Sequence, residues 1–193
     1  MQAARGASLS PSEPNPESLS PDDASRSRSR RNRCLALFWA LAVCLIAIDQ
    51  WVKELSIEKL SGEGRVELLG DWFGLQLVRN PGAAFSMGTS FTEVLSVVAT
   101  IAAVVVIWLS FKVRSTMWAV GLGFLLAGVV GNLIDRLTRE PGFGRGHVID
   151  MFAFPNFPIF NVADICINVA AAIIIIQALR GIRLDGTREE SDD

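Results

Sequence analysis

Four long apolar blocks dominate the pattern of hydrophobic and polar residues along this chain of 193 residues. The blocks cover residues 34–52, 94–111, 116–134 and 159–179, and charged residues are almost absent from them. Each block has roughly the 20 apolar residues that a helix needs to cross a bilayer. The pattern therefore predicts an all-α membrane protein with four transmembrane helices.

The polar ends of the chain predict how these helices are oriented. Residues 1–33 are rich in Ser, Pro and Arg and poor in large apolar residues, so they should be disordered. Several arginines stand directly before Cys34, and basic residues mark the cytoplasmic side. No small-residue cleavage site follows, so the first block should be an uncleaved anchor. We therefore expect a cytoplasmic N-terminal extension at 1–33, a four-span membrane domain at 34–183 and an acidic cytoplasmic tail at 184–193.

Two longer segments should face the outside of the cell. Within residues 54–92, positions 75–78 suggest a short strand, "NPG" at 80–82 suggests a turn, and 83–85 can continue as a second strand. These elements predict a small extracytoplasmic β-sheet at the membrane surface. Within residues 137–160, Gly and Pro argue against a long helix. A second outer loop is expected there, with its Phe residues near lipid headgroups.

Charge and composition argue against several classes of function. The formal net charge is −2 and no basic face is evident, so a nucleic-acid partner is not expected. Cys34, Cys44 and Cys166 fall within the apolar blocks without metal-ligand spacing, and we expect all three to be small buried hydrophobic residues. His147 is the only histidine and cannot by itself form the usual zinc site. The sequence predicts neither a metal nor another cofactor.

Polar residues within the blocks need a specific explanation, because a bare charge in lipid is costly. Asp49 and Lys53 are four residues apart and should form an ion pair on the first helix. A stripe of small residues on the third block is typical of close helix packing; it consists of Gly123, Ala127 and Gly131. Two helical faces combine carboxylates with other polar groups: Asn132, Asp135 and Arg136 on the third block, and Asn161, Asp164 and Asn168 on the fourth.

Carboxylates near one membrane surface indicate acid–base chemistry. Asp150 lies in an outer segment, and Asp164 lies a few residues into the fourth block. Two neighbouring carboxylates can share a proton, so that one serves as base and the other as acid, as in aspartic proteases. The residues alone leave the pairing open, because the matching motifs "NLID" and "NVAD" would pair Asp135 with Asp164. A small transporter or proton-conducting membrane protein is the alternative, since it also keeps Asp residues in its spans.

Five motifs taken together resemble the signature blocks of bacterial lipoprotein signal peptidase, also called signal peptidase II. They are "DQWVK" (49–53), "VRNPGAAFS" (78–86), "GNLIDR" (131–136), "GHVID" (146–150) and "FNVADI" (160–165), in this order. The resemblance implies a multi-pass aspartic endopeptidase of the bacterial inner membrane, with both termini cytoplasmic and its active site near the outer face. It implies a prolipoprotein substrate modified with diacylglyceryl, which is cut just before the lipidated cysteine.

The resemblance also implies an inhibitor and roles for individual residues. Globomycin would occupy the active site, no cofactor would be needed, and no oligomer is implied. The catalytic aspartates of the family correspond to Asp150 and Asp164, which favours this pair over the one that includes Asp135. Met151 departs from the aromatic residue common after the first catalytic aspartate, and we expect only a small packing change. The supporting polar positions correspond to Asp49, Lys53, Asn80, Gly82, Asn132, Asp135, Arg136 and Asn161.

Overall fold

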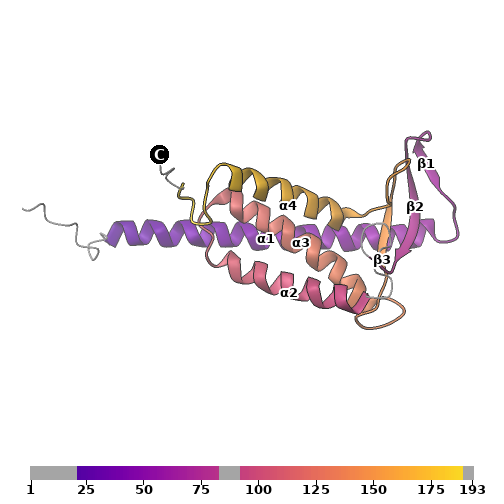
Figure 1. Ribbon diagram of the computed structural model, residues 1–193, viewed down its shortest axis with the longest axis horizontal. Helices are drawn as coiled ribbons and strands as arrows, with labels where there is room; N and C mark the ends of the chain where they lie inside the picture. Colours follow the sequence, from indigo (N-terminus) through magenta and orange to yellow (C-terminus); the bar gives the residue numbers. More distant parts are fainter. Residues whose placement is uncertain (1–20, 83–91, 189–193) are drawn as a thin grey trace, which may run out of the picture.

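The computed structural model describes residues 21–82 and 92–188 of the chain. Within these residues four helices lie side by side, and a small sheet closes one end of the bundle (Figure 1). The helices are α1 (Pro21–Leu60), α2 (Thr92–Ser110), α3 (Thr116–Thr138) and α4 (Val162–Leu179). All four are long and apolar enough to cross a membrane. The predicted four-span fold is therefore confirmed.

Helix α1 begins earlier than the sequence predicts. It starts at Pro21 and has 40 residues, whereas disorder is expected as far as residue 33. Proline suits the first helical turn, where its missing N–H needs no partner, and arginine has a high helix propensity. At 1.5 Å per residue α1 is about 60 Å long, roughly twice the thickness of the hydrocarbon core. The helix is therefore longer than a single membrane crossing requires.

The segment after α4 returns to the end of the bundle where α1 begins (Figure 1). The carbonyl of Leu184 accepts hydrogen bonds from the N–H groups of Arg114 (2.9 Å) and Ser115 (3.2 Å). The indole of Trp118 donates to the carbonyl of Ile182 at 2.8 Å. The first residues of the expected tail are thus docked on the link between α2 and α3 rather than fully solvated. Residues 189–193 lie outside the described residues.

Helix α3 lies at the centre of the bundle and packs against α1, α2 and α4. Glycines allow its close approach to α1. A Cβ atom on Gly123 would lie 3.2 Å from the carbonyl oxygen of Phe38, and one on Gly131 would lie 2.6 Å from Oδ2 of Asp49. Ala127, between these glycines, is buried. The stripe of small residues therefore marks close helix packing, as predicted.

Three antiparallel strands form the sheet in the order β1–β2–β3. They are β1 (Val66–Leu69), β2 (Phe73–Asn80) and β3 (Val148–Ala153). The strand expected at 75–78 forms the middle of β2, whereas residues 83–85 lie outside the described residues. Strand β2 pairs with β1 along one edge and with β3 along the other.

Strand β3 comes from the segment for which the sequence predicts only a loop. Its register places Asp150 opposite Val78 and Ile149 opposite Arg79. Nearly all its side chains are buried, because one face packs on α1, where Ile149 and Met151 contact the end residue Leu60. Met151, at 1% exposure, occupies this cluster in place of an aromatic residue.

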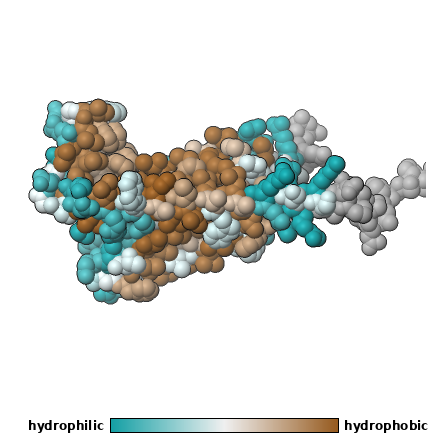
Figure 2. Space-filling view, turned by 180° about the vertical axis from the view of Figure 1, so that it is seen from behind, coloured by the Kyte–Doolittle hydropathy of each residue, from teal (hydrophilic) through white to brown (hydrophobic). Residues whose placement is uncertain are grey.

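The outer surface of the bundle is apolar. Figure 2 shows a broad hydrophobic belt over the helices, with hydrophilic residues at both ends. On α2 the exposed side chains include Val97, Ile101 and Val104. A surface of this kind suits lipid rather than water. Cys44 is exposed on α1, so the prediction that it is buried is wrong; lipid accommodates a small apolar thiol as well as a protein core does. The other two cysteines are buried.

Gly128 provides a test of the contact between α3 and α4. A Cβ atom there would lie 2.5 Å from the carbonyl oxygen of Ala163 and 3.0 Å from the amide nitrogen of Ile167. Because these are backbone atoms, Gly128→Ala should push the helices apart and lower the free energy of unfolding by about 1–3 kcal/mol. Unfolding in mixed detergent micelles measures this change. Gly64→Ala is the matched control, since its Cβ would meet nothing within 4 Å; equal stability of both variants would contradict the packing.

Candidate active site

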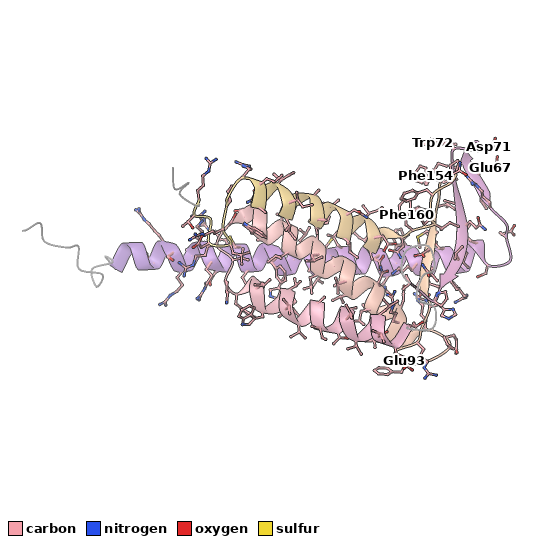
Figure 3. The ribbon with its side chains drawn as sticks, in the orientation of Figure 1. Glu67, Asp71, Trp72, Glu93, Phe154 and Phe160 are labelled. Carbon is pink, nitrogen blue, oxygen red and sulfur yellow. The ribbon has the colours of Figure 1, made fainter. Side chains whose placement is uncertain are left out.

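A pocket of about 750 Å³ lies between α2, α3 and α4, near the sheet. Its walls are mainly apolar and include Leu95, Val98, Ala102, Val129, Ile165 and Val169. Its polar lining consists of Asn80, Asn132, Arg136, Asp150, Asp164 and Asn168. Figure 3 shows Phe160, which also lines the pocket, next to Phe154 between the sheet and the start of α4. An apolar pocket with a few convergent polar groups is the usual form of a ligand site.

Strand β3 holds Asp150 at the polar end of this pocket. The residue is only 2% exposed. Its Oδ2 accepts a hydrogen bond from Nδ2 of Asn80 (3.0 Å), and its Oδ1 accepts one from Nδ2 of Asn161 (2.6 Å). Asn80 ends the neighbouring strand β2, and its own Oδ1 accepts the N–H of Gly82 at 3.0 Å. That bond orients the amide of Asn80 so that its NH2 group faces Asp150.

Asp164 lies in the first turn of α4, where a capping box fixes its position. Oδ1 of Asn161 accepts the N–H of Asp164 (3.0 Å), and Oδ2 of Asp164 accepts the N–H of Asn161 (3.1 Å). The cap explains why α4 starts at Val162 rather than at 159, where the apolar block begins. The remaining oxygen of Asp164 accepts a hydrogen bond from Nδ2 of Asn132 on α3 at 2.9 Å.

Two asparagine side chains connect the carboxylates of Asp150 and Asp164. Nδ2 of Asn161 donates to Asp150 and also to Oδ1 of Asn132, at 3.1 Å. Asn132 in turn donates to Asp164. Both aspartates line the same pocket. The structure thus brings together the two residues that the resemblance implies as catalytic.

The ammonium group of Lys53 is completely buried behind the pocket. It forms ion pairs with Oδ2 of Asp49 on its own helix (2.9 Å) and with Oδ2 of Asp135 on α3 (2.8 Å). It also donates to Oδ1 of Asn132 at 3.0 Å. The predicted pair of Asp49 and Lys53 is therefore present. A second carboxylate completes the cluster.

The two carboxylates bound to Lys53 each accept a backbone hydrogen bond as well. Oδ1 of Asp49 accepts the N–H of Ala163 (2.9 Å), and Oδ2 of Asp135 accepts the N–H of Ile149 (3.2 Å). Asp135 also pairs with Nε of Arg139 at 2.6 Å and does not line the pocket. With both its oxygens held by cations, Asp135 is a poor candidate for an acid–base pair with Asp164.

The guanidinium group of Arg136 reaches from α3 to the turn after β2. Its Nη2 donates to the carbonyl of Gly82 at 3.1 Å, and its Nη1 donates to the carbonyl of Asn132 at 3.4 Å. Its buried Nε has no hydrogen-bond partner among the described residues. Arg136 therefore brings a positive charge to the polar end of the pocket.

Burial raises the pKa of the Asp150 carboxyl from its usual 3.8 to about 6. Hydrogen bonds from Asn80 and Asn161 oppose the rise in pKa, because they favour the ionised form, while the negative charge of Asp164 adds to it. A carboxyl with a pKa near 6 exchanges its proton close to neutral pH, as an acid–base catalyst requires.

All the predicted site residues lie at the sheet end of the bundle. Six of them line the pocket: Asn80, Gly82, Asn132, Arg136, Asp150 and Asp164. The other four are buried behind it: Asp49, Lys53, Asp135 and Asn161. The sequence-based prediction missed Arg139, whose spacing from Asp135 on the same helix was the available signal. It also missed Phe160. Within 21–82 and 92–188, no three His, Cys, Asp or Glu side chains gather as a metal site would require.

Known proteins resemble this chain in sequence and in fold. The profile of the family described as Signal peptidase (SPase) II matches residues 41–180. A lipoprotein signal peptidase of Leifsonia xyli subsp. xyli is 42% identical over 172 residues, which cover 88% of this chain and 80% of that protein. One of Mycobacterium avium is 38% identical, with 89% and 96% covered. The fold is similar to a bacterial membrane enzyme solved by the in meso method at 2.3 Å resolution, with a TM-score of 0.66, 23% identity, and 80% of this chain and 94% of that chain covered.

Replacement of Lys53 tests the buried ion cluster. Lys53→Met keeps most of the side-chain volume but leaves Asp49 and Asp135 without their shared counter-ion. The free energy of unfolding should fall by about 3–5 kcal/mol, because an uncompensated charge remains buried. Lys59→Met on the same helix is the control, since its ion pair with Glu58 is exposed and should contribute about 1 kcal/mol or less. If detergent unfolding finds both variants equally stable, the cluster does not stabilise the fold.

The raised pKa of Asp150 predicts a pH-dependent stability. Because its pKa is higher in the folded protein than in the unfolded chain, the folded state holds the proton more tightly between pH 4 and 6. The contribution of Asp150 to stability should therefore be most favourable below about pH 4, decline by about 3 kcal/mol as the pH rises to about 6, and stay constant above. Asp150→Asn removes this titration, so the variant should gain stability relative to wild type between pH 4 and 7.

Unfolding free energies at several pH values between 4 and 8, in one detergent, provide the measurement. Asp71→Asn, in an exposed turn, controls for the loss of one negative charge. A difference between Asp150→Asn and wild type that is constant with pH, or that moves in the opposite direction, would show that the pKa of Asp150 is not raised.

Proposed function

The chain belongs to the signal peptidase II family, and on this premise we propose that it is a membrane aspartic endopeptidase. Its substrate is a prolipoprotein that carries a diacylglyceryl group, and it removes the signal peptide by cutting just before the lipidated cysteine. The observation that carries this proposal is the pair of carboxylates, Asp150 and Asp164, at the polar end of an otherwise apolar pocket.

In the proposed mechanism a water molecule between the two carboxylates is the nucleophile. Asp164 lies at the positive end of the α4 dipole, which favours its negative charge, and it takes a proton from the water as the oxygen attacks the scissile carbonyl carbon. Asp150 holds the proton of the pair and gives it to the carbonyl oxygen. When the tetrahedral intermediate collapses, the C–N bond breaks and the leaving nitrogen takes the proton from Asp164. The hydroxyl group returns a proton to Asp150.

The asparagines act as positioning residues in this scheme. Asn80, Asn132 and Asn161 hold both carboxylates with amide hydrogen bonds of 2.6–3.0 Å. Amides orient a carboxylate without adding a positive charge. The pair therefore keeps its tendency to share one proton, which direct pairing with a lysine would weaken.

The apolar walls of the pocket suit a substrate that enters from the membrane. Val98 on α2 and Ile165 on α4 line the pocket, and both are also exposed on the bundle surface. A signal helix and its acyl chains can therefore stay in lipid while the scissile bond reaches the carboxylates. Globomycin is expected to occupy the same pocket, and the chemistry needs no metal or organic cofactor.

We place both termini in the cytoplasm and the carboxylates near the outer face of the bacterial inner membrane. The arginines that precede Cys34 on α1 support this orientation, because basic residues are retained in the cytoplasm. The sheet and the pocket lie at the opposite end of the bundle (Figure 1).

A small transporter or proton-conducting protein is the second candidate. A conduction path requires polar groups through the depth of the bundle. In the described helices and strands, the acids Asp49, Asp135, Asp150 and Asp164 gather instead at the sheet end. This distribution favours a site for chemistry at one membrane surface.

Substitution of the two aspartates tests the mechanism. Asp150→Asn and Asp164→Asn keep the side-chain shape but cannot cycle a proton. Each should reduce kcat/KM for a lipidated prolipoprotein by about 10²–10⁴-fold. Because the residues act as a unit, the double variant should be little slower than either single one. A gel shift of the lipidated substrate measures cleavage, and a chelator should have no effect.

Asp71→Asn is the matched control for the loss of a carboxylate and should cleave normally. Near-normal cleavage by either Asp150→Asn or Asp164→Asn would refute the pair. If Asp135→Asn abolished turnover in a stably folded protein while Asp150→Asn did not, Asp135 would be the partner of Asp164. Proton flux into vesicles without any cleavage would support the transporter instead.

The orientation is tested by cysteine labelling on a background from which the three native cysteines have been removed. Glu63→Cys, before β1, should react with an impermeant maleimide added to intact spheroplasts. Thr187→Cys should react only after the membrane is opened, because it lies at the cytoplasmic end. Labelling of Thr187→Cys from the outside would reverse the proposed topology.

A further inference from the structure

The first turns of α1 form one side of a cavity that is separate from the candidate active site. Arg26, Arg30 and Arg33 follow i, i+4, i+7 spacing, so they lie on one face of the helix. Together they line a cavity of about 520 Å³ at the end of the bundle opposite the sheet. Ser29, Cys34, Leu37 and Thr116 complete its lining. Figure 2 shows hydrophilic side chains gathered at this end of the apolar belt.

The three arginines give the lining of this cavity a strongly positive charge. Across the described ranges, no ion pair is formed by any of the three arginines. Thr116 is the first residue of α3, and the first turn of that helix contains no acidic residue. The helix therefore adds the partial positive charge of its N-terminus to the same cavity. Three guanidinium groups around one space are suited to the oxygens of a phosphate group, which they can bind in a bidentate manner.

The position of the cavity indicates that this phosphate belongs to a lipid. Cys34 begins the first apolar block, so the cavity lies where the hydrocarbon of the membrane gives way to headgroups. The arginines stand on the aqueous side of this boundary. Leu37, one turn further into the membrane, lines the cavity and is also partly exposed on the bundle surface. A phosphate placed among the arginines would therefore leave an acyl chain beside Leu37.

We infer that this cavity binds the phosphate group of an anionic phospholipid in the leaflet at the N-terminal end of α1. In the proposed topology this is the cytoplasmic leaflet, but the inference does not depend on the cleavage reaction. A headgroup without an ammonium, such as phosphatidylglycerol, is preferred, because the three arginines would repel a further cation. The lipid would connect α1 to the start of α3.

Native mass spectrometry of the full-length protein in mild detergent tests this site. The probes, in separate arms, are dioleoylphosphatidylglycerol, dioleoylphosphatidylcholine and inorganic phosphate. Wild type should retain one phosphatidylglycerol much more tightly than either other probe. R30Q/R33Q removes two charges from the cavity and should weaken retention by about 25-fold, at about fivefold per arginine.

R28Q/R31Q is the matched control, since it removes two charges from the same turns of α1 at positions that do not line the cavity. It should change retention by less than about twofold. Unchanged thermal unfolding of both variants without added lipid establishes that they are folded.

Three results would overturn the inference. If the two double variants lost equal amounts of lipid, retention would come from general attraction to a basic helix and not from the cavity. Retention of inorganic phosphate as tight as that of phosphatidylglycerol would assign the site to a soluble anion. Retention of lipid only after removal of residues 189–193 would show that the acidic tail occupies the cavity in the native protein.

Discussion

The buried ammonium group of Lys53 is the interaction on which the rest of this structure depends. It holds Asp49 and Asp135 at 2.9 and 2.8 Å and thereby ties α1 to α3. The second function of these carboxylates is to bind backbone N–H groups. Asp49 binds the N–H of Ala163, directly before Asp164, and Asp135 binds the N–H of Ile149, directly before Asp150. One fully buried cation therefore positions the backbone at both proposed catalytic residues.

This arrangement separates two kinds of acidic residue within a small volume. Asp49 and Asp135 have a counter-ion and serve the fold, because a buried carboxylate is tolerated only when it is paired. Asp150 and Asp164 accept amide hydrogen bonds and, in the part of the chain that the structure describes, form no ion pair. Burial without a bound cation is what raises the pKa of Asp150.

The sequence predicts the helices well because their signal is local. Each apolar block carries its own evidence, as does the i, i+4 pair of Asp49 and Lys53. The sheet is less predictable, because α2 and α3 separate β2 from β3 in the sequence. A pairing between such distant segments leaves no local pattern. Helical spacing also has a limit of resolution. Asn132 and Asp135 share a face, as predicted, but three residues place them about 60° apart. Asn132 therefore lines the pocket as well as contacting Lys53, whereas Asp135 contacts Lys53 and does not line the pocket.

The pairing of the carboxylates needed more than spacing for the same reason. The matching N-x-x-D motifs are equivalent in sequence but not in structure, because they occupy opposite ends of their helices. Asn161 precedes α4 and caps it, so Asp164 lies in the first turn. Asp135 lies in the last turn of α3, where the helix dipole disfavours a negative charge and cations are needed nearby.

The same contrast extends to the proposed catalytic pair itself. Asp164 is held by the start of a helix, and Asp150 is held by a strand, whose dipole is small. Two acids in one pocket would be interchangeable if their surroundings were alike. Here Asp164 accepts the capping N–H at the start of α4, whereas burial favours a proton on Asp150. The division of labour between base and acid would then arise from the secondary structure that carries each residue, because both side chains have the same chemistry.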